Sequence, residues 1–188
     1  MPIYYRGAGT GTYWNTNDAT NKGFQPRDPA VTPSTTRIIQ HVAHGLTQSP
    51  YISLTRSHPV ALHYALETGT NQPTVHAPAY VYEIEIDLTS GVNLIDPLKE
   101  IAGAAVGPFD SVGYQHDGYP TVLLGVVSSL LAFFLRIPIP HAAGGGSSVR
   151  YANISPFVWG LVASLRDAEI LAIGNIPRNC VIRRTAVY

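Results

Sequence analysis

The segment Ala79–Leu88 is the part of the sequence that most narrows the fold. Its residues, AYVYEIEIDL, alternate between apolar and polar side chains, and only Val81 interrupts the polar side. Alternation with a period of two is typical of a β-strand that has one face on a core and the other toward solvent. Such strands are common in antiparallel sheets, and we interpret Glu83 and Glu85 as part of the solvent face.

Further strands and helices are indicated around this segment. Strand-like runs cover residues 2–6, 51–55, 92–95, 168–173 and 180–187. Helices are predicted at 37–44, where Gly45 is expected to end the helix, and at 60–66, where Ser57 is expected to cap it. Further helices are predicted at 97–105 and 121–135, whereas the apolar run 155–165 fits either a helix or a loop, and a glycine-rich linker lies at 144–148. With early helices and late strands, this order predicts an α+β fold built on a mostly antiparallel, twisted sheet or pair of sheets.

The composition indicates one compact domain that spans residues 1–188. Hydrophobic residues make up 45% of the chain and charged residues only 13%, which favours a well-covered core over disorder. Twelve basic residues balance twelve acidic ones, so there is no overall positive field to collect nucleic acid. The apolar run 121–135 is too short to span a bilayer comfortably, and no membrane span is expected. The N-terminus lacks the basic flank and apolar core of a signal peptide.

The sequence does not predict a metal site. The single cysteine, Cys180, excludes an internal disulfide and a cysteine-based zinc site. His41 and His44 fit one face of a helix, but no third ligand accompanies them. We therefore interpret these histidines as solvated or packed side chains.

The first pattern that can carry chemistry is Tyr5-Arg6-Gly7 at the end of the N-terminal strand. Gly7, Gly9 and Gly11 are spaced as in a dinucleotide-binding loop, but that motif needs a glycine in place of Thr12 and a helix behind it, and residues 13–17 are a poor helix start. We therefore reject that interpretation. The Arg6 guanidinium is a candidate for a bidentate phosphate contact, and pairing with a surface carboxylate fits it equally well.

The second pattern places two hydroxyls on one face of the strand 51–55. Alternation puts Ser53 and Thr55 on the same side, with Ile52 and Leu54 on the other. Two hydroxyls on one face can orient a carboxylate or a ribose through hydrogen bonds. A half-exposed strand with outward hydroxyls is the alternative interpretation.

The third pattern is a pair of carboxylates, Asp167 and Glu169, at the entrance of the strand 168–173. The two side chains share a face if the strand has already begun at Asp167. The apolar residues 157–159 shortly before them offer a dry setting, in which a carboxylate interacts strongly with developing positive charge. A solvated acidic pair is the alternative.

In this order, the patterns around Arg6, Ser53 and Glu169 resemble the Arg–Ser–Glu, cholera-toxin-like branch of the ADP-ribosyltransferase superfamily. The strand 80–88 and the turn 174–177 before a final strand fit the same family pattern. The resemblance implies a split β-sandwich of mostly antiparallel strands with flanking helices. It also implies a mono-ADP-ribosyltransferase, which cleaves NAD at the nicotinamide–ribose bond and transfers ADP-ribose to a macromolecular acceptor without a metal.

The resemblance also assigns roles to individual residues. Arg6 would anchor the NAD phosphate and ribose, and the backbone of Gly7 would hold the nicotinamide amide. Ser53 would orient the catalytic carboxylate, with Thr55 supporting the site. Glu169 would contact the nicotinamide ribose and stabilise the oxocarbenium-like transition state.

The acceptor side of the site is implied by the segment before Glu169. Residues 157–166, including Trp159, would form a loop that meets the acceptor, together with Asp167. The family usually has Glu at this last position when arginine is modified and Gln when other groups, including guanine, are modified. Asp167 keeps the acid but lacks one methylene, so a protein arginine is suggested and other acceptors stay open. The hydroxyl pattern also departs mildly from the family, with Leu54 and Thr55 where Thr and Ser are commoner.

Three alternatives remain open on function. They are transfer to a nucleic-acid base, NAD glycohydrolase activity with water as the acceptor, and a binding module of the same fold without turnover. The resemblance further implies a toxin or effector domain that is secreted or delivered into a target cell and acts in its cytoplasm. An immunity protein or a larger delivery polypeptide would be its partner.

Overall fold

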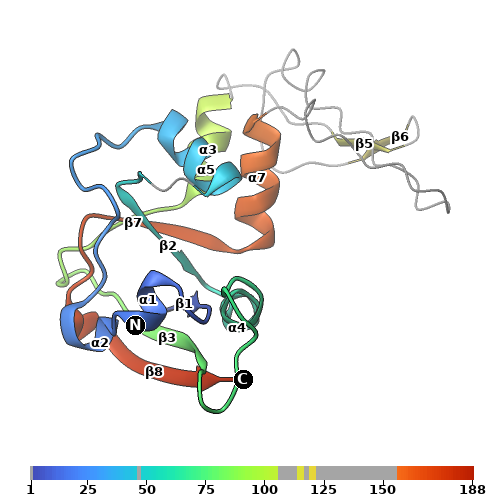
Figure 1. The fold of residues 1–188 in the computed structure, drawn as a ribbon. Helices are drawn as coiled ribbons and strands as arrows, with labels where there is room; N and C mark the ends of the chain where they lie inside the picture. Colours follow the sequence, from blue (N-terminus) through green and yellow to red (C-terminus); the bar gives the residue numbers. More distant parts are fainter. Residues whose placement is uncertain (1, 46–47, 106–113, 117–118, 122–155) are drawn as a thin grey trace, which may run out of the picture.

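The computed structural model describes residues 2–45, 48–105, 114–116, 119–121 and 156–188. Its main feature is a six-stranded sheet with the order β4-β7-β2-β1-β3-β8, in which every neighbouring pair is antiparallel (Figure 1). The strands are β1 (Ile3–Ala8), β2 (Tyr51–Thr55), β3 (Ala79–Glu85), β4 (Asn93–Ile95), β7 (Glu169–Ile173) and β8 (Val181–Val187). Strands β5 (Tyr114–His116) and β6 (Tyr119–Thr121) form a separate two-stranded sheet. The predicted α+β fold with antiparallel strands is therefore confirmed.

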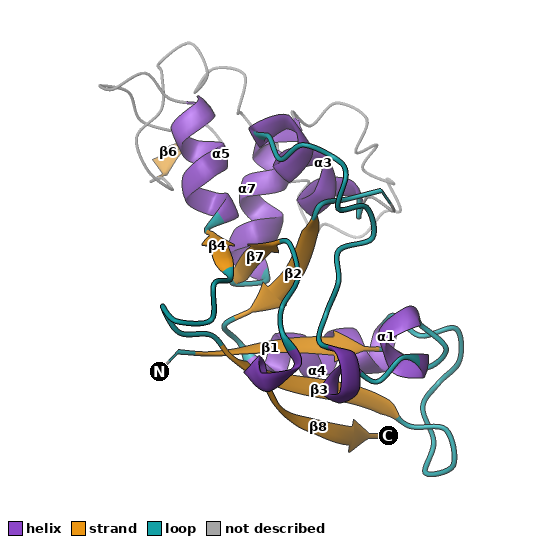
Figure 2. Ribbon diagram, turned by 90° about the vertical axis from the view of Figure 1, so that its left-hand side faces the viewer, coloured by secondary structure: helices purple, strands orange, loops and turns teal. Residues whose placement is uncertain are grey.

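The large sheet consists of two halves that meet at a single residue pair. β1 and β2 are paired only at Tyr5 and Thr55, whereas β1 pairs with β3, and β2 with β7, along their full lengths. If the antiparallel ladder continued for two more residues, Gly7 would lie opposite Ser53, but the two strands have already diverged there. Figure 2 shows the half β4-β7-β2 inclined to the half β1-β3-β8.

Different helices cover the two halves. Helices α3 (Thr35–His44), α5 (Pro97–Ala105) and α7 (Pro156–Arg166) pack together beside β2 and β7, as both views show. Helix α4 (His58–Glu67) lies against β1 and β3. Two single-turn helices, α1 (Tyr13–Thr16) and α2 (Ala19–Lys22), follow β1, and a short 3₁₀ turn, η2 (Arg178–Cys180), precedes β8.

The boundaries of α3 and α4 follow from their caps. The Ser34 hydroxyl accepts a hydrogen bond from the Arg37 backbone N–H at the start of α3, and Gly45 ends that helix with a φ of +59°. Ser57 caps α4 in the same way through the N–H of Val60. These interactions satisfy backbone groups that a helix end leaves without partners. The helix C-terminus predicted at Gly45 and the cap predicted at Ser57 are both confirmed.

Helix α4 also explains the apolar residue that interrupts the alternation of β3. Val81 is 1% exposed and packs with Ala61 and Ala65, which α4 presents to the sheet. The other apolar side chains of the strand, Tyr82 and Ile84, are fully buried on the opposite face. β3 is therefore covered on both faces near its beginning, and it ends at Glu85, before the residue predicted from the alternation.

Three further expectations need correction or fall outside the described residues. A single turn of helix, α1, does form after the glycines. It is too short for the helix of a dinucleotide-binding unit, and the strand before it belongs to an antiparallel sheet. The segment 157–166, expected as an acceptor loop, belongs to helix α7, which packs against α3 and α5 and places Leu161 in their shared core. The run 122–135 and the linker 144–148 lie outside the described residues. Among the described helices, none has the length and apolar character needed to cross a bilayer.

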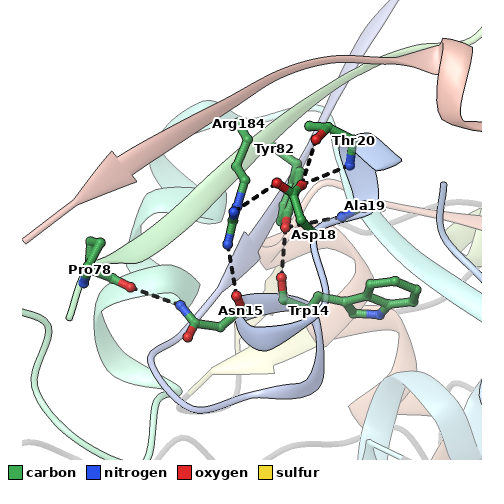
Figure 3. Close-up of polar contacts among 8 residues, drawn as sticks. All are labelled: Trp14, Asn15, Asp18, Ala19, Thr20, Pro78, Tyr82 and Arg184. Carbon is green, nitrogen blue, oxygen red and sulfur yellow. Dashed lines mark hydrogen bonds and ion pairs between the residues drawn. The ribbon is translucent and has the colours of Figure 1, made fainter. Parts of the chain in front are cut away.

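The segment that carries α1 and α2 is tied to the sheet by an arginine of β8 (Figure 3). Arg184 donates hydrogen bonds to the Asp18 carboxylate at 2.9 Å and to the Asn15 carbonyl at 2.8 Å. Its guanidinium carbon lies 3.4 Å from the centre of the Tyr80 ring. The Tyr82 hydroxyl donates to the Trp14 carbonyl at 2.7 Å. These contacts fix the backbone that precedes the loop to α3.

Candidate functional site

A cleft of about 460 Å³ opens at the point where β1 and β2 diverge. Its walls come from β1, β2, α1, α3, α4 and the residues that precede β7. Arg6, Ser53, Thr55, Asp167 and Glu169 all line it. The structure therefore brings together the three sequence patterns that are far apart in the chain. The volume is in the range of small-molecule sites.

Arg6 reaches across the divergence of the two strands. Its Nη1 donates a hydrogen bond of 2.5 Å to the Ser53 carbonyl, which has no partner from β1 at this point of the ladder. The guanidinium thus replaces the missing strand contact and spans the two halves of the sheet. No ion pair with a surface carboxylate holds it within the described ranges.

The Arg6 guanidinium has spare capacity for a ligand. Its Nε is buried and has no hydrogen-bond partner among the described residues. Burial, and then the charge of Arg27, lower the pKa of Arg6 to about 10, whereas Glu169 opposes this shift. A buried donor without a partner is unfavourable unless something binds to it. Arg6 and Arg27 both line the cleft, so the part of it around these two side chains suits an anionic group, while Asp167 and Glu169 line it elsewhere.

Ser53 belongs to a chain of hydrogen bonds that begins on α3. The Ser49 Oγ lies 2.6 Å from Nδ1 of His41, and Nε2 of His41 lies 2.7 Å from the Ser53 Oγ. The Ser53 hydroxyl also lowers the pKa of the nearby Glu169 carboxylate through a hydrogen-bond interaction. Burial, and then the charges of Arg6 and Arg27, lower the pKa of His41 to about 4, so this ring is neutral at pH 7.

The direction of the chain follows from the donors available. When Glu169 is ionised it can only accept, so the Ser53 hydroxyl donates to it and needs a donor from Nε2 of His41, which leaves Nδ1 to accept from the Ser49 hydroxyl; the Ser49 Oγ also accepts from the Tyr51 backbone N–H at 3.2 Å. The neutral ring then carries its proton on Nε2 and donates to Ser53. The hydroxyl proton of Ser53 is left for Glu169, whose pKa this bond lowers. Ser53 therefore acts as a donor toward the carboxylate.

Glu169 lies at the start of β7, opposite Thr55 in the ladder. Burial, with a smaller effect of the nearby Asp167, raises the pKa of its carboxyl to about 7, against the lowering effects of Ser53, Arg6 and Arg166. The protein thus compensates only part of the cost of burying the negative charge of Glu169. In such an environment, its charge interacts strongly with a positive centre.

The two residues before Glu169 form a tight turn that is held from β2. The Thr55 hydroxyl donates to the Asp167 carbonyl at 2.5 Å, and the Arg56 backbone N–H donates to the Ala168 carbonyl at 3.1 Å. Ala168 has a φ of +46°. The strand begins only at Glu169, so Asp167 lies in the turn before it. Contrary to the expectation from the sequence, the two carboxylates therefore do not share a face of one strand.

The Thr55 side chain is buried and stabilises this turn; it does not lie on the surface. It is 6% exposed, and its hydroxyl also accepts from the Ser57 backbone N–H at 3.0 Å. On the other side of β2, Ile52 and Leu54 are in the core, as the alternation predicts. The outward-facing strand that was the alternative interpretation does not occur here.

Gly7 is required first by the packing of α4. A Cβ at this position would lie 2.2 Å from the Ala61 carbonyl oxygen and 2.7 Å from the Ala65 nitrogen. Its backbone also lines the cleft. The close approach that the glycines permit at residues 7 and 9 is thus an approach to the chain itself, to α4 and to Gly69.

Aromatic rings close the cleft beside Arg6. Tyr13 and Trp14 line it, and Trp14 makes an edge contact with Phe24 at 4.8 Å between ring centres. The Arg6 guanidinium carbon lies 5.9 Å from the centre of the Phe24 ring. Because Arg184 and Tyr82 hold the backbone of α1, this aromatic wall has a fixed position (Figure 3).

Sequence reasoning missed three residues of the site. His41 was interpreted as solvated or packed, although it bridges two serines. Tyr64 donates to the Asp167 carboxylate at 2.6 Å, and Arg27 adds a second positive charge to the cleft. Each of them depends on a tertiary contact, and only the histidine had a local signal, namely its position shortly before a strand with two hydroxyls. Trp159, expected at the acceptor side, lies in α7, and its side chain is outside the described part of the structure.

Among the described residues, no group of three or more His, Cys, Asp or Glu side chains is arranged to hold a metal ion. Comparisons of the chain with protein-family models, curated proteins and solved structures found no match. The functional argument therefore depends on the geometry of this cleft and on the patterns in the sequence.

Proposed function

We propose that this protein is a mono-ADP-ribosyltransferase of toxin or effector type, which cleaves NAD and transfers ADP-ribose to a macromolecular acceptor. The observation that carries the proposal is the convergence of Arg6, Ser53 and Glu169 on one cleft at the divergence of β1 and β2. These are the residues that the sequence resemblance selects. Arg6 supplies a positive charge for the diphosphate of NAD, and Glu169 supplies a carboxylate for the positive charge that develops on the ribose.

Arg6 is proposed to bind the NAD diphosphate. Nη2 and the remaining donor of Nη1 can contact phosphate oxygens while Nη1 keeps its bond to Ser53. Arg27, on the rim of the same cleft, adds to the attraction for the anionic group. The aromatic wall of Tyr13 and Trp14 suits the planar rings of a dinucleotide.

Glu169 is proposed to assist cleavage of the nicotinamide–ribose bond. Its carboxylate accepts a hydrogen bond from the ribose 2′-hydroxyl and stabilises the positive charge that develops at C1′. Nicotinamide leaves as a neutral molecule with the electron pair of the broken C–N bond. A lone pair of the acceptor then forms the new bond to C1′ from the opposite face, and the acceptor proton passes to solvent.

His41 and Ser49 are proposed to position the carboxylate through Ser53. With the His41 ring donating to Ser53, the Ser53 hydroxyl keeps its own proton for Glu169. A fixed donor holds the carboxylate in place and favours its ionised form. In this account the two residues act through Ser53 and do not touch the substrate.

The proposal is tested with labelled NAD and a cell lysate. The native protein is expected to transfer label to a macromolecular fraction, and Glu169→Gln is expected to transfer at least about 100-fold less. Equal transfer by both proteins would remove Glu169 from the reaction. Digestion of the product with protease or nuclease tells a protein acceptor from a nucleic acid.

NAD glycohydrolase activity is the second candidate, because Glu169 would assist the same bond cleavage with water as the acceptor. Nicotinamide release is measured with and without lysate. Release that is independent of the lysate, with no labelled macromolecule, favours hydrolysis. A lack of NAD binding by calorimetry would favour a binding module without turnover.

A further inference from the structure

The carboxylate of Asp167 already holds a guanidinium of the same chain. Nε of Arg166 donates to Oδ1 at 2.6 Å, and Nη2 of Arg166 donates to Oδ2 at 2.7 Å. This is the two-pronged pairing in which planar guanidinium and carboxylate groups fit best. The Tyr64 hydroxyl donates to Oδ2 as well, at 2.6 Å.

Little of this carboxylate is left for another partner. A carboxylate has about four acceptor positions, and three donors already occupy Asp167. The Asp167 side chain is 14% exposed, whereas that of Arg166 is 61% exposed. An incoming molecule that reaches Asp167 from the cleft therefore meets a carboxylate whose charge is already paired with a guanidinium.

The cluster has a fixed geometry. The backbone of Asp167 and Ala168 is held from β2 by Thr55 and Arg56. Burial, and then the bond to Asp167, raise the pKa of Tyr64 to about 12, so this hydroxyl stays a donor throughout the physiological range. Because Arg166 is the chain neighbour of Asp167, its effective concentration is far above that of any free acceptor, at least in the millimolar range.

Resting on the proposed function, we infer that Arg166 determines acceptor specificity: it occupies the carboxylate that an arginine acceptor would need, and so selects acceptors without a guanidinium. A guanidinium acceptor has to displace Arg166 and approach its charge at the same time. An acceptor group with neutral or anionic neighbours does not have to displace Arg166 and is not repelled by its charge. The sequence suggested a protein arginine as the acceptor because of Asp167, and left other acceptors open. The pairing of Asp167 with Arg166 favours these other acceptors.

Agmatine, a small guanidinium compound, is the probe for the occupied carboxylate. Binding is measured by calorimetry, without NAD, for the native protein, Arg166→Gln and Arg183→Gln. Arg183 is a matched control, because its side chain is 67% exposed and pairs with Glu83 on the sheet. We expect Arg166→Gln to bind agmatine at least about tenfold more tightly than the other two, and the added change Asp167→Asn to abolish the gain.

The second measurement adds NAD and follows three products: nicotinamide, free ADP-ribose and ADP-ribosyl-agmatine. The ratio of the agmatine adduct to free ADP-ribose is expected to rise about tenfold in Arg166→Gln and to stay at the native value in Arg183→Gln. The ratio is used because it does not depend on the total rate of cleavage.

The outcomes separate the two claims. Nicotinamide release by the native protein, with no gain of agmatine binding or of the adduct ratio in Arg166→Gln, overturns the inference and leaves the proposed function standing. A native protein that already forms the adduct as efficiently as the variant also overturns it. If the native protein releases no nicotinamide with any acceptor, the proposed function fails and the inference with it.

Discussion

At the scale of single residues, the site is defined by charges that the fold only partly compensates. Arg6 keeps a buried nitrogen without a partner among the described residues, and Glu169 titrates near neutral pH. Such groups reduce the stability of a protein when no ligand is bound. Their presence in one cleft is the physical reason for assigning them to binding and catalysis, and it makes their replacement informative.

Arg6→Met is expected to separate stability from binding. Methionine keeps much of the length of the side chain and removes a desolvated charge, but it also leaves the Ser53 carbonyl without its donor, so the two effects offset each other and the free energy of unfolding is expected to change by no more than about 2 kcal/mol. NAD affinity is expected to fall at least about 100-fold, because charged hydrogen bonds to phosphate are lost. Denaturant unfolding and calorimetry check the two effects. Arg178→Met, at an exposed position, is the control, and global unfolding of Arg6→Met would indicate a purely structural role.

Glu169→Gln is expected to change the pH dependence of stability. Burial raises the pKa of Glu169 from 4.5 to about 7, so between these values the folded protein binds a proton that the unfolded chain releases. Stability of the native protein therefore falls as the pH rises through this window, and the variant escapes this loss. The variant is expected to gain roughly 1 to 3 kcal/mol over the native protein by pH 7.5 and almost nothing at pH 4. A difference that is independent of pH would show that the carboxyl is not desolvated.

At the scale of secondary structure elements, the turn between α7 and β7 decides where Glu169 points. Its two carbonyls are bonded from β2, and Ala168 adopts a left-handed conformation with a φ of +46°. An alanine in this conformation is strained by about 1 kcal/mol relative to glycine. The strain persists because the bonds from Thr55 and Arg56 determine the path of the chain.

Ala168→Gly is therefore expected to stabilise the fold by up to about 1 kcal/mol. The matched control is Ala172→Gly, which makes the same change four residues later in β7, where the side chain is fully buried. That variant is expected to lose about 1 kcal/mol or more, because glycine weakens a strand and removes a packed methyl group. Thermal unfolding of both variants measures the difference. Destabilisation of the same size in both would contradict the strained turn.

Local sequence signals predicted most elements but not the turns and pairings that depend on distant residues. The alternation in β2 predicted the orientation of Ser53, Gly45 predicted where α3 ends, and Ser57 predicted where α4 begins. The apolar run 155–165 fits a helix or a loop, and the family resemblance favours a loop over 157–166; packing against α3 and α5 makes this segment the helix α7. The pairing of Arg166 with Asp167 depends on a turn whose bonds come from residues 55 and 56, more than a hundred positions away.

At the scale of the whole molecule, the divergence of one pair of strands creates the site. The sheet is continuous through Tyr5 and Thr55 and then opens, so each half contributes one charged wall of the cleft. Arg6 comes from the half β1-β3-β8, and Glu169 from the half β4-β7-β2. The order of motifs in the sequence suggested that these residues meet. The contact of His41 with Ser53 depends on how α3 packs beside β2, so the position of His41 shortly before a strand with two hydroxyls is only an indirect signal for it.

The most direct test of the central claim is the rate of nicotinamide release from NAD by the native protein, Glu169→Gln and Glu85→Gln. Glu85 is a matched control, because it lies on β3 and is not part of the cleft lining. The account predicts release by the native protein and by Glu85→Gln at similar rates, and a rate at least about 100-fold lower for Glu169→Gln. Similar release by all three proteins, or none by the native protein with any acceptor, would contradict it.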